Sequence, residues 1–207
     1  MTHFVIVRHG ETLWNRDQRI QGQRNSALSP VGEMQAHATA RRLRDAACDR
    51  LVSSDLGRTV QTAQPIAAET GLPLETDRRV RERCFGVFEG MTRDEIQSQH
   101  ALAFARWQTR DPDYAMQGGE SLNRLCNRVR ECLESIATET PGKVIVVTHG
   151  GVLDAVYRIA ANLALDALRT WQLLNSSINE IEIDAGRWRL LEWGYVEHLP
   201  RADDDFG

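Results

Sequence analysis

Apolar residues gather in short runs along the chain, and these runs predict the strands of a sheet. Residues 4–7 and 144–147 are each four consecutive apolar residues rich in valine and isoleucine, which suits strands covered on both faces. The apolar pair at 51–52 and the short segment 74–76 predict two more strands. Apolar residues at alternating positions around 184–186 predict a hairpin near the end of the chain.

Helical patterns lie between the predicted strands. Ser29 has the character of an N-cap with Pro30 at the first helical position, and Thr92 with Glu95 forms a capping-box pattern. Helices are therefore predicted from Pro30 onward, over 55–71, from 92 toward 107, over 121–137 and after Gly150. In the last of these, one face carries Val152, Val156, Ile159 and Leu163.

The alternation of strands and helices predicts an α/β fold. We expect a three-layer α/β/α architecture with a mostly parallel central sheet. No repeat or low-complexity linker divides the chain, so a single domain is expected over 1–198. Residues 84–120 show helices without an obvious sheet strand and are expected to form a helical lid or substrate flank. Residues 199–207 are expected to be a disordered tail.

Three of the predicted strands lead directly to a positive charge or an imidazole. Arg8-His9 follows the first strand, His149 follows 144–147, and Arg58 opens the helix after 51–52. Because the carboxyl ends of parallel strands meet at one edge of a sheet, where ligands bind, we expect these side chains to lie together. Guanidinium groups match phosphate oxygens, helix N-termini add N–H donors, and a neutral histidine can act as a nucleophile. The pattern therefore indicates phosphoryl transfer.

Composition limits the alternatives. The chain has 207 residues, 42% hydrophobic and 26% charged, as in an ordinary globular domain. A net charge of −4 disfavours a nucleic-acid binder, and no apolar run approaches the ~18 residues of a membrane span. The start of the chain lacks the pattern of a secretion signal, so a cytoplasmic location is expected. The four cysteines show no metal-ligand spacing.

These residues stand in a series of motifs that resembles the histidine phosphatase superfamily, in its phosphoglycerate mutase-like branch. The resemblance runs from about residue 3 to about residue 195, and the motifs occur in the family's order. They are Arg8-His9-Gly10-Glu11-Thr12 with Trp14-Asn15, Arg19-Ile20-Gln21-Gly22, Leu28-Ser29 with Gly32, Ser53-Ser54-Asp55-Leu56-Gly57-Arg58-Thr59 with Gln61-Thr62-Ala63, Arg81-Glu82 with Gly86 and Glu89-Gly90, Gly118-Gly119-Glu120-Ser121, and Thr148-His149-Gly150-Gly151.

The resemblance implies roles for individual residues. His9 would be the nucleophile that becomes phosphohistidine, and Glu82 the proton donor to the leaving alcohol and later the base for water. The phosphate-binding residues would be Arg8, Asn15, Gln21, Arg58, His149 and Gly150. His9 is also expected to donate its Nδ1–H to a backbone carbonyl, which leaves Nε2 free to attack.

Departures from the mutase pattern favour a phosphatase. The mutases follow the acid with Arg-His-Tyr-Gly, whereas this chain has Arg83-Cys84-Phe85-Gly86. No long basic insertion comparable to the mutases' substrate-binding segment lies between Glu82 and Gly118, and Arg110-Asp111 replaces two adjacent arginines. A phosphomonoester hydrolase that acts on small phosphorylated metabolites is therefore the leading expectation.

Two alternatives stay open. Arg83 and Arg93 are available to bind a substrate carboxylate, as in a phosphoglycerate mutase, an isomerase whose histidine is primed by 2,3-bisphosphoglycerate. The Gly-Gly-Glu-Ser motif at 118–121 also belongs to the α-ribazole phosphatase pattern. Apart from that primer, the resemblance implies no metal and no organic cofactor. It implies a small phosphorylated metabolite as the partner, neither nucleic acid nor a membrane, and homodimers are common in the family.

Overall fold

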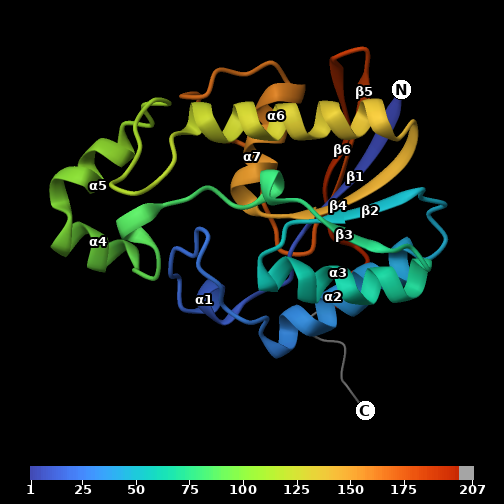
Figure 1. Ribbon diagram of the computed structural model, residues 1–207. Coiled ribbons are helices and arrows are strands. Elements are labelled where there is room, and N and C mark those ends of the chain that lie inside the picture. Colours follow the sequence, from blue (N-terminus) through green and yellow to red (C-terminus); the bar gives the residue numbers. More distant parts are fainter. Residues whose placement is uncertain (201–207) are drawn as a thin grey trace.

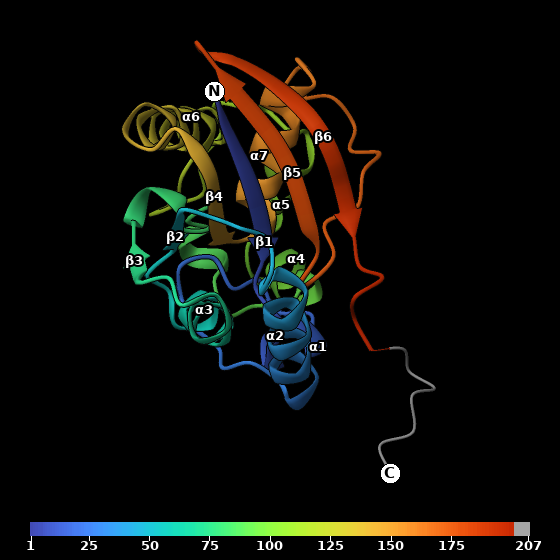
Figure 2. The same cartoon turned by 90° about the vertical axis from the view of Figure 1, so that its right-hand side faces the viewer.

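A six-stranded sheet forms the centre of the computed structural model, which describes residues 1–200. The strands lie in the order β3-β2-β4-β1-β5-β6, with β3 and β6 at the two edges (Figure 2). β1 to β4 run parallel to one another, whereas β5 is antiparallel to both of its neighbours, β1 and β6, so the sheet is mostly parallel as predicted. The strands are β1 (Thr2–Arg8), β2 (Arg50–Ser53), β3 (Leu74–Thr76), β4 (Gly142–Thr148), β5 (Ile178–Asp184) and β6 (Arg187–Tyr195).

The register of β1 on β4 places the two histidine motifs side by side. Phe4 pairs with Val144, and the ladder ends where Arg8 pairs with Thr148. His9 and His149 therefore leave the sheet at the same level. The four apolar residues at 4–7 have no exposed surface, which explains why both faces of this strand are apolar.

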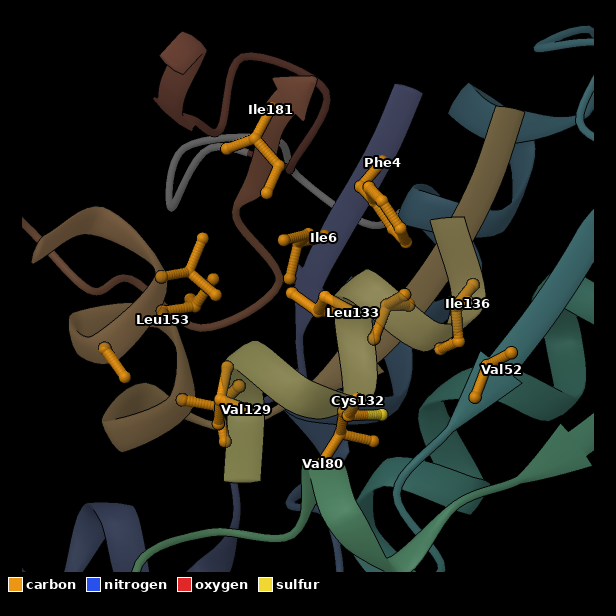
Figure 3. Close-up of a cluster of buried hydrophobic side chains, with 14 of the residues drawn as sticks. Phe4, Ile6, Val52, Val80, Val129, Cys132, Leu133, Ile136, Leu153 and Ile181 are labelled. Carbon is orange, nitrogen blue, oxygen red and sulfur yellow. The ribbon is translucent and has the colours of Figure 1, made fainter. Parts of the chain in front are cut away.

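Helices cover both faces of the sheet and form the predicted three layers (Figure 1). One face packs against α6 (Leu122–Glu139) and α7 (Gly150–Ala160), and Figure 3 shows this cluster around Phe4, Ile6 and Leu133. The other face packs against α2 (Pro30–Leu43) and α3 (Gly57–Thr70). Burial of these two apolar surfaces fixes the helices on the sheet, and with them the loops at its carboxyl edge.

The segment 84–120 lies to one side of the layers, where Figure 1 shows α4 (Arg93–Gln99) and α5 (Ala101–Gln108). It has an apolar cluster of its own, formed by Phe88, Ile96, Phe104 and Met116. The single helix predicted from 92 toward 107 is wrong, because His100 has non-helical angles (φ −135°, ψ 41°). The break turns α5 so that Trp107 packs against Phe88, with ring centroids 5.7 Å apart.

Several boundaries differ from the sequence prediction. α7 ends at Ala160, so Leu163 follows the helix instead of lying on its apolar face. A short helix, α1 (Leu13–Arg16), was not predicted because four residues are too few to show a period. A 3-10 turn at Arg78–Val80 connects β3 to the 84–120 segment, and a second one, Gly86–Phe88, lies within that segment.

Near the C-terminus, the hairpin of β5 and β6 is present as predicted. Of the tail predicted over 199–207, residues 201–207 lie outside the described part of the chain. No helix within residues 1–200 has the length and apolar character needed to cross a membrane.

Candidate active site

Three strand ends bring the predicted site residues together. Arg8 is the last residue of β1, and His9 follows it. His149 is the N-cap of α7, directly after β4. Arg58 lies in the first turn of α3, after β2. The imidazole centroids of His9 and His149 are 5.3 Å apart, with the rings inclined at 61°.

The geometry of His9 suits a nucleophile. Its Nδ1 lies 2.7 Å from the carbonyl oxygen of Gly10. Because a carbonyl can only accept, the proton is on Nδ1 and the lone pair is on Nε2, as predicted. Burial, reinforced by the charges of Arg58 and Arg8, holds the pKa of His9 well below its usual value. The imidazole is therefore neutral at pH 7.

The Arg58 guanidinium is fixed by backbone carbonyls. It has no exposed surface, and it donates to the carbonyls of Gly22 at 2.7 Å and Arg24 at 2.8 Å. Its Nε lies 3.3 Å from Nε2 of His9. Burial lowers the pKa of Arg58 to about 10, so it keeps its charge at neutral pH. A cation held beside the predicted nucleophile is placed to bind a phosphoryl group without further ordering.

Arg8 and His149 each present a buried nitrogen that has no partner within residues 1–200. The Arg8 guanidinium donates to the carbonyl of Leu173, and its Nε is unpaired. Nε2 of His149 lies 2.8 Å from the Ser54 hydroxyl, while its Nδ1 is unpaired. Burial lowers the pKa of both groups. Buried polar atoms without partners are unfavourable. An oxyanion would satisfy the Nε–H of Arg8, and it would satisfy Nδ1 of His149 in the tautomer that carries its proton there.

Glu82 lies in the loop after the first 3-10 turn, and its side chain extends to the start of α7, next to His149. Its Oε2 accepts from the backbone N–H of Gly151 at 3.0 Å and its Oε1 from that of Arg83 at 2.7 Å. A β-carbon on Gly151 would stand only 2.2 Å from Oε1. Glycine at 151 therefore permits the carboxylate to approach the start of α7.

Asn15, Gln21 and Gly150 lie around this group with less direct geometry. The side-chain oxygen Oδ1 of Asn15 accepts from the backbone N–H and the hydroxyl of Thr12 and closes the capping box of α1. The side-chain nitrogen Nδ2 is left for a ligand. Gln21 is buried, and its Oε1 has no partner in the described chain. Gly150 opens α7, and a β-carbon there would lie 3.5 Å from Nε of Arg8. The phosphate-binding roles of these three residues stay predictions.

Sequence reasoning missed the residues that support the site. Ser54 holds His149, and only its place in the Ser-Ser-Asp motif gave a signal. Asn25 accepts from the Arg58 backbone N–H at 3.0 Å, and Asn175 donates to the His9 carbonyl at 3.0 Å. Neither asparagine stands in a recognisable pattern. Glu89, which belongs to the Glu-Gly motif, accepts from the backbone N–H of Gln23 at 3.0 Å.

A cavity of about 760 Å³ extends from the strand ends toward the 84–120 segment. Arg8, Gly150 and Gly151 form its inner end. Its outer walls come from Arg83, from the 84–120 segment and from the loop after α7. The residues of these two segments include Phe85, Arg93, Trp107, Arg110, Tyr114, Leu168, Arg169 and Leu173. Within residues 1–200, no three histidine, cysteine, aspartate or glutamate side chains are grouped so that they could hold a metal ion.

The two buried imidazoles make stability depend on pH. The pKa of His9 and of His149 is lowered in the folded protein. Below the ordinary histidine pKa of about 6.5, the unfolded chain therefore binds more protons than the folded protein. The free energy of unfolding therefore has its full value above pH 6.5. It decreases as the pH falls below 6.5 toward the pKa values of the two histidines in the folded protein. Urea unfolding in phosphate-free buffer between pH 7.5 and 5 checks this, and a midpoint that stays constant over that range would contradict it.

Comparisons with known proteins agree with this arrangement. The model of the histidine phosphatase superfamily (branch 1) matches residues 4–196. The probable phosphoglycerate mutase GpmB of Yersinia pestis is 36% identical, over 99% of each chain. Among solved structures, YhfR of Bacillus stearothermophilus is 31% identical with a TM-score of 0.90, covering 97% of this chain and 100% of that one.

A second solved structure is a mycobacterial glucosyl-3-phosphoglycerate phosphatase in complex with VO3. It is 31% identical with a TM-score of 0.83, and the match covers 94% of this chain and 99% of the other. The relatives thus include proteins named as mutases and proteins named as phosphatases. Members of the family act through a phosphohistidine. The match of nearly the whole chain shows that this protein belongs to the histidine phosphatase superfamily, branch 1.

Proposed function

We propose that this protein hydrolyses phosphate monoesters of small metabolites through a phosphohistidine at His9. The observation that carries the proposal is the juxtaposition at the strand ends. A neutral imidazole presents Nε2 beside the fixed guanidinium of Arg58, 5.3 Å from the second imidazole, and Glu82 is held at the start of α7.

In the first step, Nε2 of His9 attacks phosphorus and the bond from phosphorus to the ester oxygen breaks. Glu82 gives its proton to the departing alcohol oxygen. Arg8, Arg58 and His149 bind the equatorial oxygens of the transferring group, together with the backbone N–H of Gly150. In this proposal the amide nitrogens of Asn15 and Gln21 complete the phosphate contacts.

In the second step, water attacks the phosphohistidine. Glu82, now a carboxylate, takes a proton from the water as the new oxygen–phosphorus bond forms and the bond to Nε2 breaks. Inorganic phosphate leaves, and both His9 and Glu82 return to their starting protonation states. No step in this cycle needs a metal or an organic cofactor.

The surroundings of Arg83 support hydrolysis over mutase activity. Its Nε donates to the Glu120 carbonyl at 2.8 Å and its Nη2 to the Tyr114 carbonyl at 3.1 Å. A guanidinium engaged with backbone oxygens offers fewer donors to a substrate carboxylate. Mutase activity is the second candidate, because Arg93 and Arg110 also line the cavity and can bind an anionic substrate.

The Gly-Gly-Glu-Ser motif supports the loop that carries the proposed acid. The Glu120 carboxylate pairs with Arg128 at 2.7 Å, and Arg128 donates to the backbone carbonyl of Glu82 at 3.0 Å. The motif therefore has a structural task here. It gives no separate support for α-ribazole phosphatase activity.

Trapping the phosphoenzyme tests the proposal. Incubation with a turned-over phosphate ester is expected to give an acid-labile, base-stable phosphoprotein, located on His9 by peptide mapping. On 3-phosphoglycerate, phosphate release should exceed formation of 2-phosphoglycerate, both with and without 2,3-bisphosphoglycerate. Isomerisation faster than phosphate release would favour the mutase, and the absence of any phosphohistidine across a broad panel of metabolites would reject both.

A further inference from the structure

Asp154 is an acidic residue that lines the cavity and has no role in the proposed reaction. It follows Gly150 and Gly151 by four and three residues in α7, so it lies on the same helix face, roughly one turn or about 5–6 Å along. Gly150 lies against Arg8, and Gly151 lies against Glu82. The two glycines and Arg8 line the cavity. Asp154 is therefore close to the place where the organic part of a bound ester must lie.

The two oxygens of the Asp154 carboxylate differ in their surroundings. Oδ2 accepts from Nε of Arg158 at 2.9 Å, and the Arg158 side chain is 1% exposed. Oδ1 is buried, and nothing within residues 1–200 donates to it. A buried acceptor without a donor is unfavourable, so a ligand that brings a donor to Oδ1 gains affinity.

The charge of the cavity indicates which donor this is. Arg158 already balances the charge of Asp154. Apart from Asp154, the charged groups that line the cavity are Asp111 and the arginines Arg8, Arg83, Arg93, Arg110 and Arg169. An ammonium group would enter a region of net positive charge, whereas a hydroxyl donates a hydrogen bond without that repulsion.

We propose that Asp154 determines substrate specificity by accepting, through Oδ1, a hydrogen bond from a free hydroxyl group of the leaving alcohol. The inference rests on the proposed function. It goes beyond it by specifying the substrate class: a phosphate ester with a hydroxyl one or two carbons from the ester oxygen. Asp154 lies one helical turn beyond Gly150, whose N–H is proposed to bind the phosphate, so the donor that it can meet belongs to a carbon near the ester oxygen.

Matched pairs of substrates test this in the unmodified protein. 3-Phosphoglycerate and the phosphate ester of 3-hydroxypropionate differ only in the hydroxyl at the carbon next to the carboxylate, and propane-1,2-diol 1-phosphate is matched to propyl phosphate in the same way. We expect kcat/KM to favour the hydroxylated member by about tenfold or more, because a site built to bond a hydroxyl discriminates against its absence. p-Nitrophenyl phosphate serves to measure phosphohistidine formation independently of either pair.

The variant Asp154→Asn provides the second arm. Its amide oxygen can still accept from Arg158, but an N–H group, which donates, takes the place of the accepting Oδ1. The preference for the hydroxylated substrate should fall severalfold, because the hydroxyl can no longer donate to this side chain and can only accept from its amide. Asp166→Asn changes an exposed aspartate that does not line the cavity, and it should keep the wild-type preference.

The outcomes separate this inference from the proposed function. Equal rates on both members of each pair would overturn the inference, and so would an unchanged preference in a folded Asp154→Asn variant. It would also be overturned if p-nitrophenyl phosphate phosphorylates the protein but neither substrate pair is turned over. If that variant does not fold, the preference of the wild type decides. Failure to form phosphohistidine from any ester would instead reject the proposed function, and the inference with it.

Discussion

Replacing His9 with alanine should lower kcat/KM for every phosphate ester by about 10⁴-fold or more and abolish the phosphoenzyme. The reason is that Nε2 of His9 is the proposed nucleophile beside Arg58, and loss of the nucleophile in covalent catalysis costs several orders of magnitude. Steady-state kinetics and ³²P incorporation measure the two effects. Inorganic phosphate should still bind, because Arg8, Arg58 and His149 remain.

The matched control is His37→Ala, which removes an exposed histidine of α2. It should leave turnover and phosphorylation at wild-type levels. Because His9 is buried, its removal leaves the Gly10 carbonyl without its donor and should cost about 1–3 kcal/mol of unfolding free energy. Thermal melts show whether the variant is folded at the assay temperature. Full turnover by folded His9→Ala would refute the mechanism.

Replacing Glu82 with glutamine should produce the second-largest effect, and its size should depend on the leaving group. Alkyl phosphates need a proton on the departing oxygen, so their kcat should fall by about 10²–10⁴-fold. p-Nitrophenyl phosphate has a leaving group that departs as an anion, so formation of the phosphoenzyme from it should be much less affected. Single-turnover phosphorylation of a series of aryl phosphates measures this.

In that series, the phosphorylation rate of Glu82→Gln should decrease steeply as the pKa of the leaving phenol rises, while the wild type changes little. A merely structural role for Glu82 would slow all esters equally and would contradict the assignment. Glu131→Gln, at an exposed position of α6, is the matched control and should leave the series unchanged. The hydrogen bonds to Gly151 and Arg83 make some loss of position in Glu82→Gln expected, because the amide can accept at only one of them.

The residues at the strand ends could be predicted from sequence because local patterns report burial. Runs such as 4–7 and 144–147 are apolar throughout since both faces of these central strands are covered. The motifs that follow them carry Arg8, His9 and His149, and the parallel register of β1 and β4 brings these together as expected. The Nδ1 contact of His9 was also predicted and is confirmed.

Other features could not be predicted, because they depend on contacts between distant segments. The break at His100 follows from the packing of α5 around Phe88, which no helical period reports. The carbonyls of Gly22 and Arg24 that hold Arg58 belong to a loop without regular structure. The unpaired oxygen of Asp154 is visible only once its helix face is placed on the cavity.

By itself, the sequence determined the α/β class, the strand ends and the residue types of a phosphoryl-transfer site. It could do so because alternation of burial and the chemistry of neighbouring residues are encoded locally. Only the tertiary structure decided how Glu82 meets Gly151, how Arg58 is held beside Nε2 of His9, and which side chains line the cavity. Those arrangements depend on register and packing between segments tens of residues apart, which a local pattern does not contain.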